Sequence, residues 1–209
     1  MVTVKVCGMT NEADARAAVE AGADALGFIC YRKSPRFVEP NVIKRIVATL
    51  PPFVVPVGVF VNEEAQTVRA VMDDTGLMLA QLHGDESAAY CEQLGRPAIK
   101  AFRIKGPTAM LALAEYQGRA GIRAFLLDAY SDQVYGGTGQ VVDWASAAQV
   151  AKATRVVLAG GLTPENVGEA IRAVRPYGVD VSSGVESAPG RKDHARVRAF
   201  VEAVRLVSL

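Results

Sequence analysis

The amino-acid sequence predicts an α/β fold, a single-domain (β/α)8 barrel (TIM barrel) with eight parallel strands over residues 1–209. Eight apolar, strand-like segments alternate with eight helical segments, and the unit repeats roughly every 20 to 30 residues, as repeated supersecondary units do. The strand segments are apolar on both faces, which is typical of a parallel sheet covered by helices. No linker rich in Pro, Gly or Ser divides the chain. The rival architecture is an open doubly wound sheet, but the turn Cys7-Gly8-Met9-Thr10 lacks the glycines that usually follow its first strand.

The first half of the chain supplies four strand–helix units. Val2, Val4 and Val6 alternate with polar residues, which is the period of a strand. Helix starts are expected at residues that accept hydrogen bonds from free backbone N–H groups, or at proline. In order, we predict a strand over 2–6, a helix over 11–20 capped by Thr10, a strand over 24–29, a helix after Pro40, a strand over 53–61, a helix capped by Asn62, a strand over 77–82 and a helix capped by Asp85.

The second half repeats the pattern around one long loop. In order, we predict a strand over 98–102, a helix over 109–116, a strand over 124–128, the loop, a helix capped by Asp143, a strand over 155–159, a helix opened by Thr163 and Pro164, a strand over 179–181 and a helix capped by Asp193. The loop contains Gly136-Gly137-Thr138-Gly139 well beyond its strand, so we interpret it as a mobile loop over the site.

The composition fits a globular protein, with 50% hydrophobic and 22% charged residues. A net charge of +1 without runs of Lys and Arg offers no footprint for nucleic acid or a membrane surface, so we expect neither partner. We expect no signal peptide, because the residues run straight into the first predicted strand, and no apolar stretch is long enough to span a bilayer. Three widely spaced cysteines suit a reducing compartment, so we expect a cytoplasmic protein. Two histidines without ligand spacing argue against a metal site. We expect a monomer or a homodimer.

Two glycine-bearing segments follow the seventh and eighth predicted strands, and together they predict a phosphate site. In barrels, the loops at these two positions commonly bind phosphate. Glycine lets the backbone approach an anion, while serine hydroxyls and N–H groups at a helix start donate to it. Either segment alone is explained as well by tight turns. The candidate residues are Gly160, Gly161, Asp180, Ser182, Ser183 and Gly184.

Two ionisable residues end strands on opposite sides of the predicted ring. Cys7 ends the first strand and Asp128 ends the sixth, so their side chains face each other across the mouth of the barrel. One ionisable group on each side of a substrate suits proton transfer at two atoms. Each residue also has a structural explanation, because cysteine is a common small core residue and aspartate often caps loops.

Three further polar residues are candidates for substrate binding. Arg36 follows the second strand, beside the first, and its planar fork suits a carboxylate. Gln81 and His83 end the fourth strand, where His83 is a donor to substrate or a structural histidine. The other histidine, His194, is expected to be solvated on the outer helix. A solvated surface residue is the alternative for Arg36 as well.

Taken together, these motifs resemble the phosphoribosylanthranilate isomerase family, in order and over the whole chain. One departure is Cys30-Tyr31-Arg32, where the family has an aromatic residue at 30 and a proline at 32. The matching segments are Lys5-Val6-Cys7-Gly8, Gly27-Phe28, Lys33-Ser34-Pro35-Arg36-Phe37-Val38, Gln81-Leu82-His83-Gly84, Leu127-Asp128, Gly136-Gly137-Thr138-Gly139, Gly160-Gly161-Leu162-Thr163 and Asp180-Val181-Ser182-Ser183-Gly184-Val185-Glu186.

The resemblance implies an Amadori rearrangement in tryptophan biosynthesis, from N-(5'-phosphoribosyl)anthranilate to 1-(2-carboxyphenylamino)-1-deoxyribulose 5-phosphate. It implies Cys7 as the general base, Asp128 as the general acid and Arg36 as the partner of the anthranilate carboxylate. The two glycine-bearing loops are then the phosphate site. The substrate nitrogen is the electron sink, so neither a cofactor nor a metal is implied.

This chemistry needs a thiolate beside a protonated carboxyl group. Reference pKa values of about 8.5 for Cys and 3.9 for Asp favour the opposite pairing, and reversing them costs roughly 6 kcal/mol. Burial can raise the pKa of the acid, and N–H groups or a nearby lysine can lower that of the thiol. We hypothesise that the pair titrates as a coupled unit and reacts through a minor protonation state.

Two other functions are compatible with a phosphate-binding barrel. One is a sugar-phosphate epimerase or a lyase, which would need metal ligands, or a catalytic lysine and glutamate, at the strand ends. The other is a non-catalytic barrel that only binds a phosphorylated ligand. Loss of substrate fluorescence on mixing with phosphoribosylanthranilate separates these functions.

Overall fold

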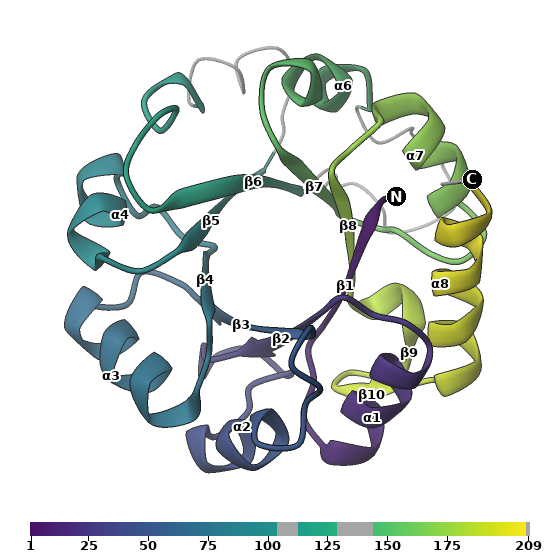
Figure 1. Ribbon diagram of the computed structural model, residues 1–209, viewed down its shortest axis with the longest axis horizontal. Coiled ribbons are helices and arrows are strands. Elements are labelled where there is room, and N and C mark those ends of the chain that lie inside the picture. The colour runs from purple at the N-terminus through teal and green to yellow at the C-terminus, as the bar shows by residue number, and fades with distance from the viewer. Residues whose placement is uncertain (104–112, 129–143, 208–209) are drawn as a thin grey trace.

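The computed structural model describes residues 1–103, 113–128 and 144–207, and it is a closed barrel of eight parallel strands. The strands neighbour one another in sequence order, and β8 closes the ring by pairing with β1 (Figure 1). The predicted barrel is therefore confirmed. The strands are β1 (Thr3–Cys7), β2 (Ala25–Ile29), β3 (Val55–Phe60), β4 (Leu79–Leu82), β5 (Ala98–Arg103), β6 (Ile122–Asp128), β7 (Val156–Ala159) and β8 (Gly178–Val181).

Helices surround the barrel on the outside (Figure 1). Those described are α1 (Glu12–Glu20), α2 (Pro40–Val47), α3 (Ala65–Thr75), α4 (Ala88–Leu94), α6 (Trp144–Ala153), α7 (Val167–Val174) and α8 (His194–Val207). After β8 come a short 3-10 helix, η1 (Ser183–Val185), and an unpredicted hairpin of β9 (Glu186–Ala188) and β10 (Arg191–Lys192). Three predictions fall on residues outside the described ranges: the first half of the helix over 109–116, the Gly136–Gly139 loop and the Asp143 cap. Within the described part, no helix is long and apolar enough to cross a membrane.

Two predicted helix starts lie too early in the chain, and at α1 the neighbouring residue makes the capping contact. Asn11, and not Thr10, accepts the hydrogen bond from Asp14 N at 2.9 Å, while the Thr10 hydroxyl donates to the Gly190 carbonyl. The predicted start of α7 at Thr163 is also early, since the helix begins at Val167. The Asp193 cap of α8 is confirmed, since its carboxylate accepts hydrogen bonds from Ala195 N and Arg196 N.

The two caps predicted after β3 and β4 are likewise wrong, and one contact explains both. Asn62 has a φ of 51°, and its side-chain oxygen accepts from Asp85 N at 2.6 Å. The two residues therefore tie the loops after β3 and β4 to each other, and neither caps a helix. Helix α3 starts at Ala65 instead, and α4 is capped by Ser87, whose hydroxyl accepts from Tyr90 N.

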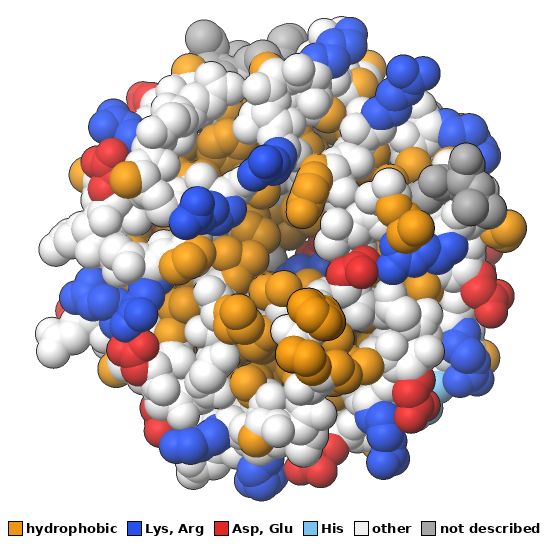
Figure 2. Space-filling model, viewed as in Figure 1, with side chains coloured by type: hydrophobic (Ala, Val, Ile, Leu, Met, Phe, Trp, Pro, Cys, Tyr) orange, Lys and Arg blue, Asp and Glu red, His pale blue; other side chains and the backbone are white. Residues whose placement is uncertain are grey.

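Apolar side chains form two layers, one on each face of the barrel. The larger cluster lies between strands and helices and includes Val4, Val6 and Leu82. The smaller one fills part of the barrel interior with residues of β5, β6 and β7, such as Leu126. On the face shown in Figure 2, hydrophobic side chains gather round the centre, while most charged side chains lie towards the rim and a few lie near the centre. On β1, Val4 and Val6 pack towards the helices, so the alternating residues Lys5 and Cys7 point into the barrel.

Candidate active site

A cavity at the carboxyl ends of the strands is lined by all eleven candidate site residues. In barrel enzymes this end carries the active site because the βα loops converge there. Apolar side chains of β2, β3 and β7 complete its wall. The candidates that meet here are Cys7, Arg36, Gln81, His83, Asp128, Gly160, Gly161, Asp180, Ser182, Ser183 and Gly184.

Cys7 and Asp128 reach this cavity from opposite sides of the ring. Cys7 is the last residue of β1 and Asp128 the last of β6, which the strand order places three strands apart. The Cys7 side chain is buried, with 5% of the residue exposed, whereas Asp128 keeps 24% of its side chain exposed. A ligand in the cavity therefore meets a thiol on one side and a carboxyl group on the other.

The environment of the Cys7 thiol is crowded, apolar and charged at once. Cys7 is in register with Gly27 of β2, and a methyl group on Gly27 would lie only 2.6 Å from Cys7 Sγ. Burial raises the pKa of the thiol, Lys5 lowers it, Asp180 raises it and Lys192 lowers it, and the net pKa is above the usual value of 9.0. Thiolate formation is therefore opposed by burial and favoured by two lysines.

Lys5 and Asp180 form a buried ion pair beneath the cavity, with 2.8 Å between Nζ and Oδ1. The two residues are in register on the neighbouring strands β1 and β8, and their side chains are 5% and 9% exposed. Sequence reasoning selected Asp180 as a ligand of the substrate but missed Lys5. The period of two on β1 was the available signal, because it places Lys5 on the same face as Cys7.

Arg36 lines the cavity but is also bound by a carboxylate that the sequence analysis did not assign to the site. Its guanidinium donates three hydrogen bonds of 2.7–3.0 Å to Glu186, and these bonds together with the ion pair raise the pKa of Arg36 despite partial burial. Glu186 also accepts from Lys192 Nζ at 2.9 Å and from Gly190 N. Among the described residues, Arg36 Nη1 donates no hydrogen bond, so one edge of the fork remains for a ligand.

His83 lies between Gln81 and Asp128. Gln81 Nε2 is 2.9 Å from His83 Nδ1, and His83 Nε2 is 3.7 Å from Asp128 Oδ2. If the amide donates to Nδ1, the ring proton sits on Nε2 and faces the Asp128 carboxyl group. Gln81 Oε1 is buried without a hydrogen-bond partner in the described part of the chain, and the residue lines the cavity. A buried acceptor of this kind calls for a donor from a ligand or from water.

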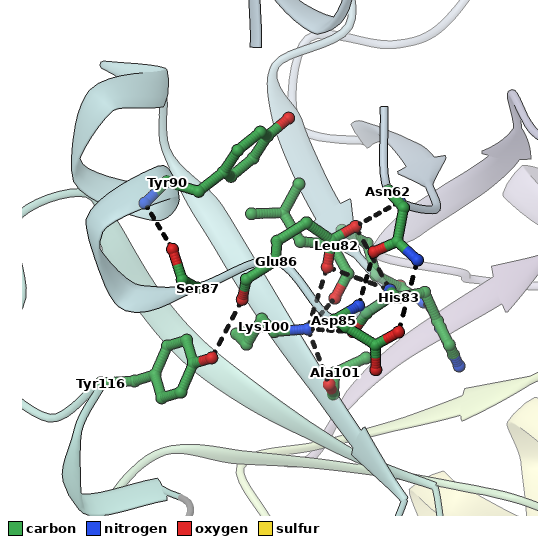
Figure 3. Close-up of polar contacts among 12 residues, drawn as sticks. Asn62, Leu82, His83, Asp85, Glu86, Ser87, Tyr90, Lys100, Ala101 and Tyr116 are labelled. Carbon is green, nitrogen blue, oxygen red and sulfur yellow. Dashed lines mark hydrogen bonds and ion pairs between the residues drawn. The ribbon is translucent and has the colours of Figure 1, made fainter. Parts of the chain in front are cut away.

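A buried ion pair fixes the loop that carries His83 (Figure 3). Lys100 Nζ on β5 donates to the carbonyl oxygens of Leu82 and Gly84, on either side of His83, and lies 3.0 Å from Glu86 Oε2. Glu86 in turn accepts from the backbone N–H groups of Gly84 and of residue 62. Both ionic side chains are 2% exposed. The backbone on both sides of His83 is thus held by one buried pair, which sequence reasoning missed.

The two glycine-bearing loops lie side by side at the cavity. Gly160 and Gly161 have φ values of 88° and 63°, a left-handed conformation that favours glycine. A methyl group on Gly184 would collide with the Leu162 carbonyl oxygen, so the η1 segment packs directly on the loop after β7. The Ser182 hydroxyl is buried and lacks a hydrogen-bond partner among the described residues. This hydroxyl is therefore able to form a hydrogen bond with a polar ligand atom or with water.

The sequence predicted a solvated His194, but in the structure this histidine is bound to an aspartate. Its Nε2 is 2.8 Å from Asp14 Oδ1, and Asp14 also accepts from Lys192 N, so the histidine helps to join α1, β10 and α8. In the described part of the chain, no group of three or more His, Cys, Asp or Glu residues is placed to hold a metal ion.

Comparisons with known proteins agree with this geometry. A family model described as "N-(5'phosphoribosyl)anthranilate (PRA) isomerase" matches residues 4–203. A relative from Geobacter sp. (strain M21), named N-(5'-phosphoribosyl)anthranilate isomerase, is 51% identical over 208 residues, with 100% of both chains covered. The crystal structure of phosphoribosyl anthranilate isomerase from Thermotoga maritima matches with a TM-score of 0.90 and 43% identity, covering 98% of this chain and 99% of that one. A structure of this isomerase with reduced 1-(o-carboxyphenylamino)-1-deoxyribulose 5-phosphate matches with a TM-score of 0.88 and 40% identity, at 98% and 99% coverage.

Proposed function

The chain belongs to the N-(5'-phosphoribosyl)anthranilate isomerase family, and from this membership and the residues of its cavity we infer how it works. It is an isomerase of tryptophan biosynthesis. It converts N-(5'-phosphoribosyl)anthranilate to 1-(2-carboxyphenylamino)-1-deoxyribulose 5-phosphate by an Amadori rearrangement. Its ligand is therefore a small phosphorylated aminosugar. The roles that follow are our proposals for individual residues.

We propose that the loops after β7 and β8 bind the phosphate group. Gly160 and Gly161 let the backbone approach an anion closely, and Ser182 supplies a buried hydroxyl without a protein partner. Ser183 and Gly184 begin the η1 segment beside them. Phosphate binding at these two loops is common in barrels, because their backbone N–H groups converge on one point.

Arg36 binds the anthranilate carboxylate through the edge of its guanidinium that Glu186 leaves open. Bidentate contact with Glu186 holds the guanidinium plane in place, so the ligand meets a preoriented donor. Asp180 and Gln81 face the sugar from β8 and β4, and either can accept hydrogen bonds from its hydroxyl groups. With the phosphate and the carboxylate bound at opposite ends, the ribose lies between Cys7 and Asp128.

Asp128 acts as the general acid. It protonates the furanose ring oxygen, and the C1–O bond breaks to leave a protonated Schiff base between C1 and the anthranilate nitrogen. His83, whose Nε2 lies 3.7 Å from Asp128 Oδ2, supports the carboxyl group with a hydrogen-bond donor or a proton. Because the buried Lys100–Glu86 pair holds the backbone on both sides of His83, the position of that backbone does not depend on the ligand.

Cys7 acts as the general base. Its thiolate removes the proton from C2, and the electron pair of that C–H bond moves to the Schiff base to give an enolamine. The enolamine then gains a proton at C1 and loses the proton of its C2 hydroxyl group, which gives the C2 ketone. Since burial raises the pKa of the thiol, only a minor fraction of the free enzyme holds the thiolate. We propose that the reaction proceeds from this minor thiolate form of the enzyme.

The observation that supports these roles most strongly is that Cys7 and Asp128 line one cavity from opposite strands. The test is to mix the enzyme with N-(5'-phosphoribosyl)anthranilate and to follow the fluorescence of this substrate. Chromatography then identifies the isomeric product. We expect the fluorescence to fall over many turnovers and a product of unchanged mass to appear. Binding without fluorescence loss would instead support the non-catalytic barrel, and activity on a sugar phosphate alone would support an epimerase or a lyase.

The assembly and location also remain proposals. We propose that the protein is a monomer or a homodimer, and sedimentation at several protein concentrations distinguishes the two. We propose neither nucleic acid nor a membrane as a partner. A cytoplasmic location is supported by three free cysteines, Cys7, Cys30 and Cys91, since a reducing compartment preserves free thiols.

A further inference from the structure

Two buried lysines differ in how completely their ammonium groups are bound. Lys100 Nζ donates to the carbonyl oxygens of Leu82, Gly84 and residue 101, and it pairs with Glu86 as well. Lys5, which is just as buried, donates to a single oxygen of the described residues, Asp180 Oδ1. A buried ammonium group has three hydrogens and loses its hydration, so unused donors are costly. The ammonium group of Lys100 therefore has all its N–H donors bound to the protein, whereas that of Lys5 has N–H donors that can interact with another group.

That other group is the Cys7 thiol. A methyl group on Gly27 would lie 2.6 Å from Cys7 Sγ and 3.0 Å from Lys5 Nζ, so sulfur and ammonium share the small space above this glycine. Cys7 is in register with Gly27 on the neighbouring strand, and Lys5 is the preceding inward residue of β1. Glycine at position 27 is what makes the approach possible. Three adjacent strands thus build this polar contact. Asp180 of β8 binds the lysine, β1 carries both Lys5 and Cys7, and Gly27 of β2 leaves enough space for their side chains.

Several charges act on Cys7, and Lys5 is the strongest cation among them. Burial raises the pKa of the thiol, Lys5 lowers it, Asp180 raises it and Lys192 lowers it to a smaller extent. Arg36, from the loop after β2, interacts with Cys7 as well but is neutralised by Glu186. On the far side of the cavity are Asp128 and His83.

We propose that Lys5 is the positioning residue for the catalytic base: Asp180 holds its ammonium group against Cys7 Sγ, and this charge makes the thiolate accessible for proton removal. The proposal rests on the role of Cys7 proposed above. Lys5 does not line the cavity, so it acts through the thiol and not on the substrate. In this arrangement Asp180 has two tasks, since it also faces the cavity from β8.

The test measures the thiol directly, without substrate. The variant is Lys5→Met, and the control is Lys44→Met, which removes a lysine paired with one aspartate at 2.7 Å on the surface. The rate of alkylation of Cys7 by iodoacetamide is measured against pH, with peptide mass spectrometry to separate Cys7 from Cys30 and Cys91. We expect the midpoint for Cys7 to rise by about one pH unit or more in Lys5→Met, equivalent to a tenfold loss of thiolate at neutral pH. Lys44→Met is expected to match the wild type.

A second variant, Lys5→Met/Asp180→Asn, removes the carboxylate that Lys5→Met leaves buried and unpaired. If the ammonium charge is what favours the thiolate, the midpoint of the double variant stays above that of the wild type. A return to the wild-type midpoint would assign the effect to the unpaired carboxylate and overturn the proposal. The double variant also provides the test if Lys5→Met does not fold, as judged by circular dichroism.

Turnover gives an independent readout. In Lys5→Met we expect kcat at neutral pH to fall tenfold or more and its pH dependence to shift upward with the alkylation midpoint, while KM changes less than about threefold. An unchanged alkylation profile would refute the role of Lys5 even if Cys7→Ser is inactive. Full activity of Cys7→Ser would refute the base assignment instead, whatever the alkylation profile shows. The two proposals therefore fail in different experiments.

Discussion

Arg36 and Glu186 are joined by a bidentate ion pair, with Nη2 and Oε2 2.7 Å apart, although 150 residues separate them in the chain. The pair ties the loop after β2 to the hairpin after β8, and β2 and β8 are the two strands that flank β1 with Cys7. The Glu186 side chain is only 4% exposed and also binds Lys192. One buried carboxylate thus orients the guanidinium that we propose for the anthranilate carboxylate.

The first prediction concerns the pH dependence of stability at this pair. Burial raises the pKa of Glu186, but the hydrogen bonds and charges of Arg36 and Lys192 together lower it by more. The net pKa of Glu186 therefore lies below the usual 4.5. A lowered pKa in the folded state stabilises the fold above the unfolded pKa, and that contribution is lost as the pH falls through the folded pKa. The stability difference between wild type and Glu186→Gln is therefore expected to be largest near neutral pH and to shrink below about pH 4.5.

Urea denaturation across this pH range measures the difference. Glu39→Gln is the control, because Glu39 pairs with Arg32 at the surface, where both side chains are more than half exposed. A surface pair contributes at most about 1 kcal/mol. A difference for Glu186→Gln that stays constant down to acid pH would contradict this account of the pair.

The second prediction separates binding from stability at Ser182. Its hydroxyl is buried without a partner in the described part of the chain, so Ser182→Ala removes an unsatisfied group and is expected to leave the unfolding free energy unchanged or slightly higher. If this hydroxyl donates to the substrate phosphate, KM rises about tenfold or more, since a hydrogen bond to a charged group is worth about 1.5–3 kcal/mol. Thermal melts and steady-state kinetics measure the two effects.

Ser87→Ala is the matched control for this variant. The Ser87 hydroxyl caps α4 by accepting from Tyr90 N at 3.2 Å. Its removal is expected to cost about 1 kcal/mol of stability and to leave KM unchanged. If Ser182→Ala behaved like Ser87→Ala in both measurements, Ser182 would be a structural hydroxyl and not a phosphate ligand.

The third prediction compares a buried with an exposed ion pair. Lys100→Met leaves the Glu86 carboxylate buried without its cation, and removing one partner of a buried pair costs about 3–5 kcal/mol. Lys44→Met breaks the Lys44–Asp74 pair, whose side chains are 57% and 52% exposed, and is expected to cost less than about 1 kcal/mol. Denaturant titration of both variants provides the comparison. Equal losses would show that Lys100 does not hold the loop after β4 in the way described.

The barrel was predictable from sequence because each strand carries a local signal. A run of buried apolar residues ends at a polar or glycine residue, as in β6, where four buried residues lead to Asp128. Since all strands are parallel, every such end lies at the same rim, and this alone brought Cys7 and Asp128 to one cavity. Strand periodicity and fold topology were sufficient there.

The ion pairs around the site were not predictable, because their partners are far apart in the chain. Lys5 and Asp180 are separated by 175 residues, and only the register of β1 with β8 brings them together. The helix caps that were wrong failed for a related reason. Asn62 is a good N-cap residue by local propensity, but a tertiary contact with Asp85 N occupies its side chain. Local preference yields where a neighbouring loop offers a better partner.

The most direct test of the account is the turnover of Cys7→Ser with N-(5'-phosphoribosyl)anthranilate, measured by fluorescence beside the wild type. A serine hydroxyl keeps the size of the side chain but not the acidity of the thiol, so the fold is retained while the base is lost. We predict that kcat falls by a factor of about 10² to 10⁴, the contribution of a general base, with circular dichroism unchanged. A folded Cys7→Ser variant with wild-type kcat would contradict the central claim.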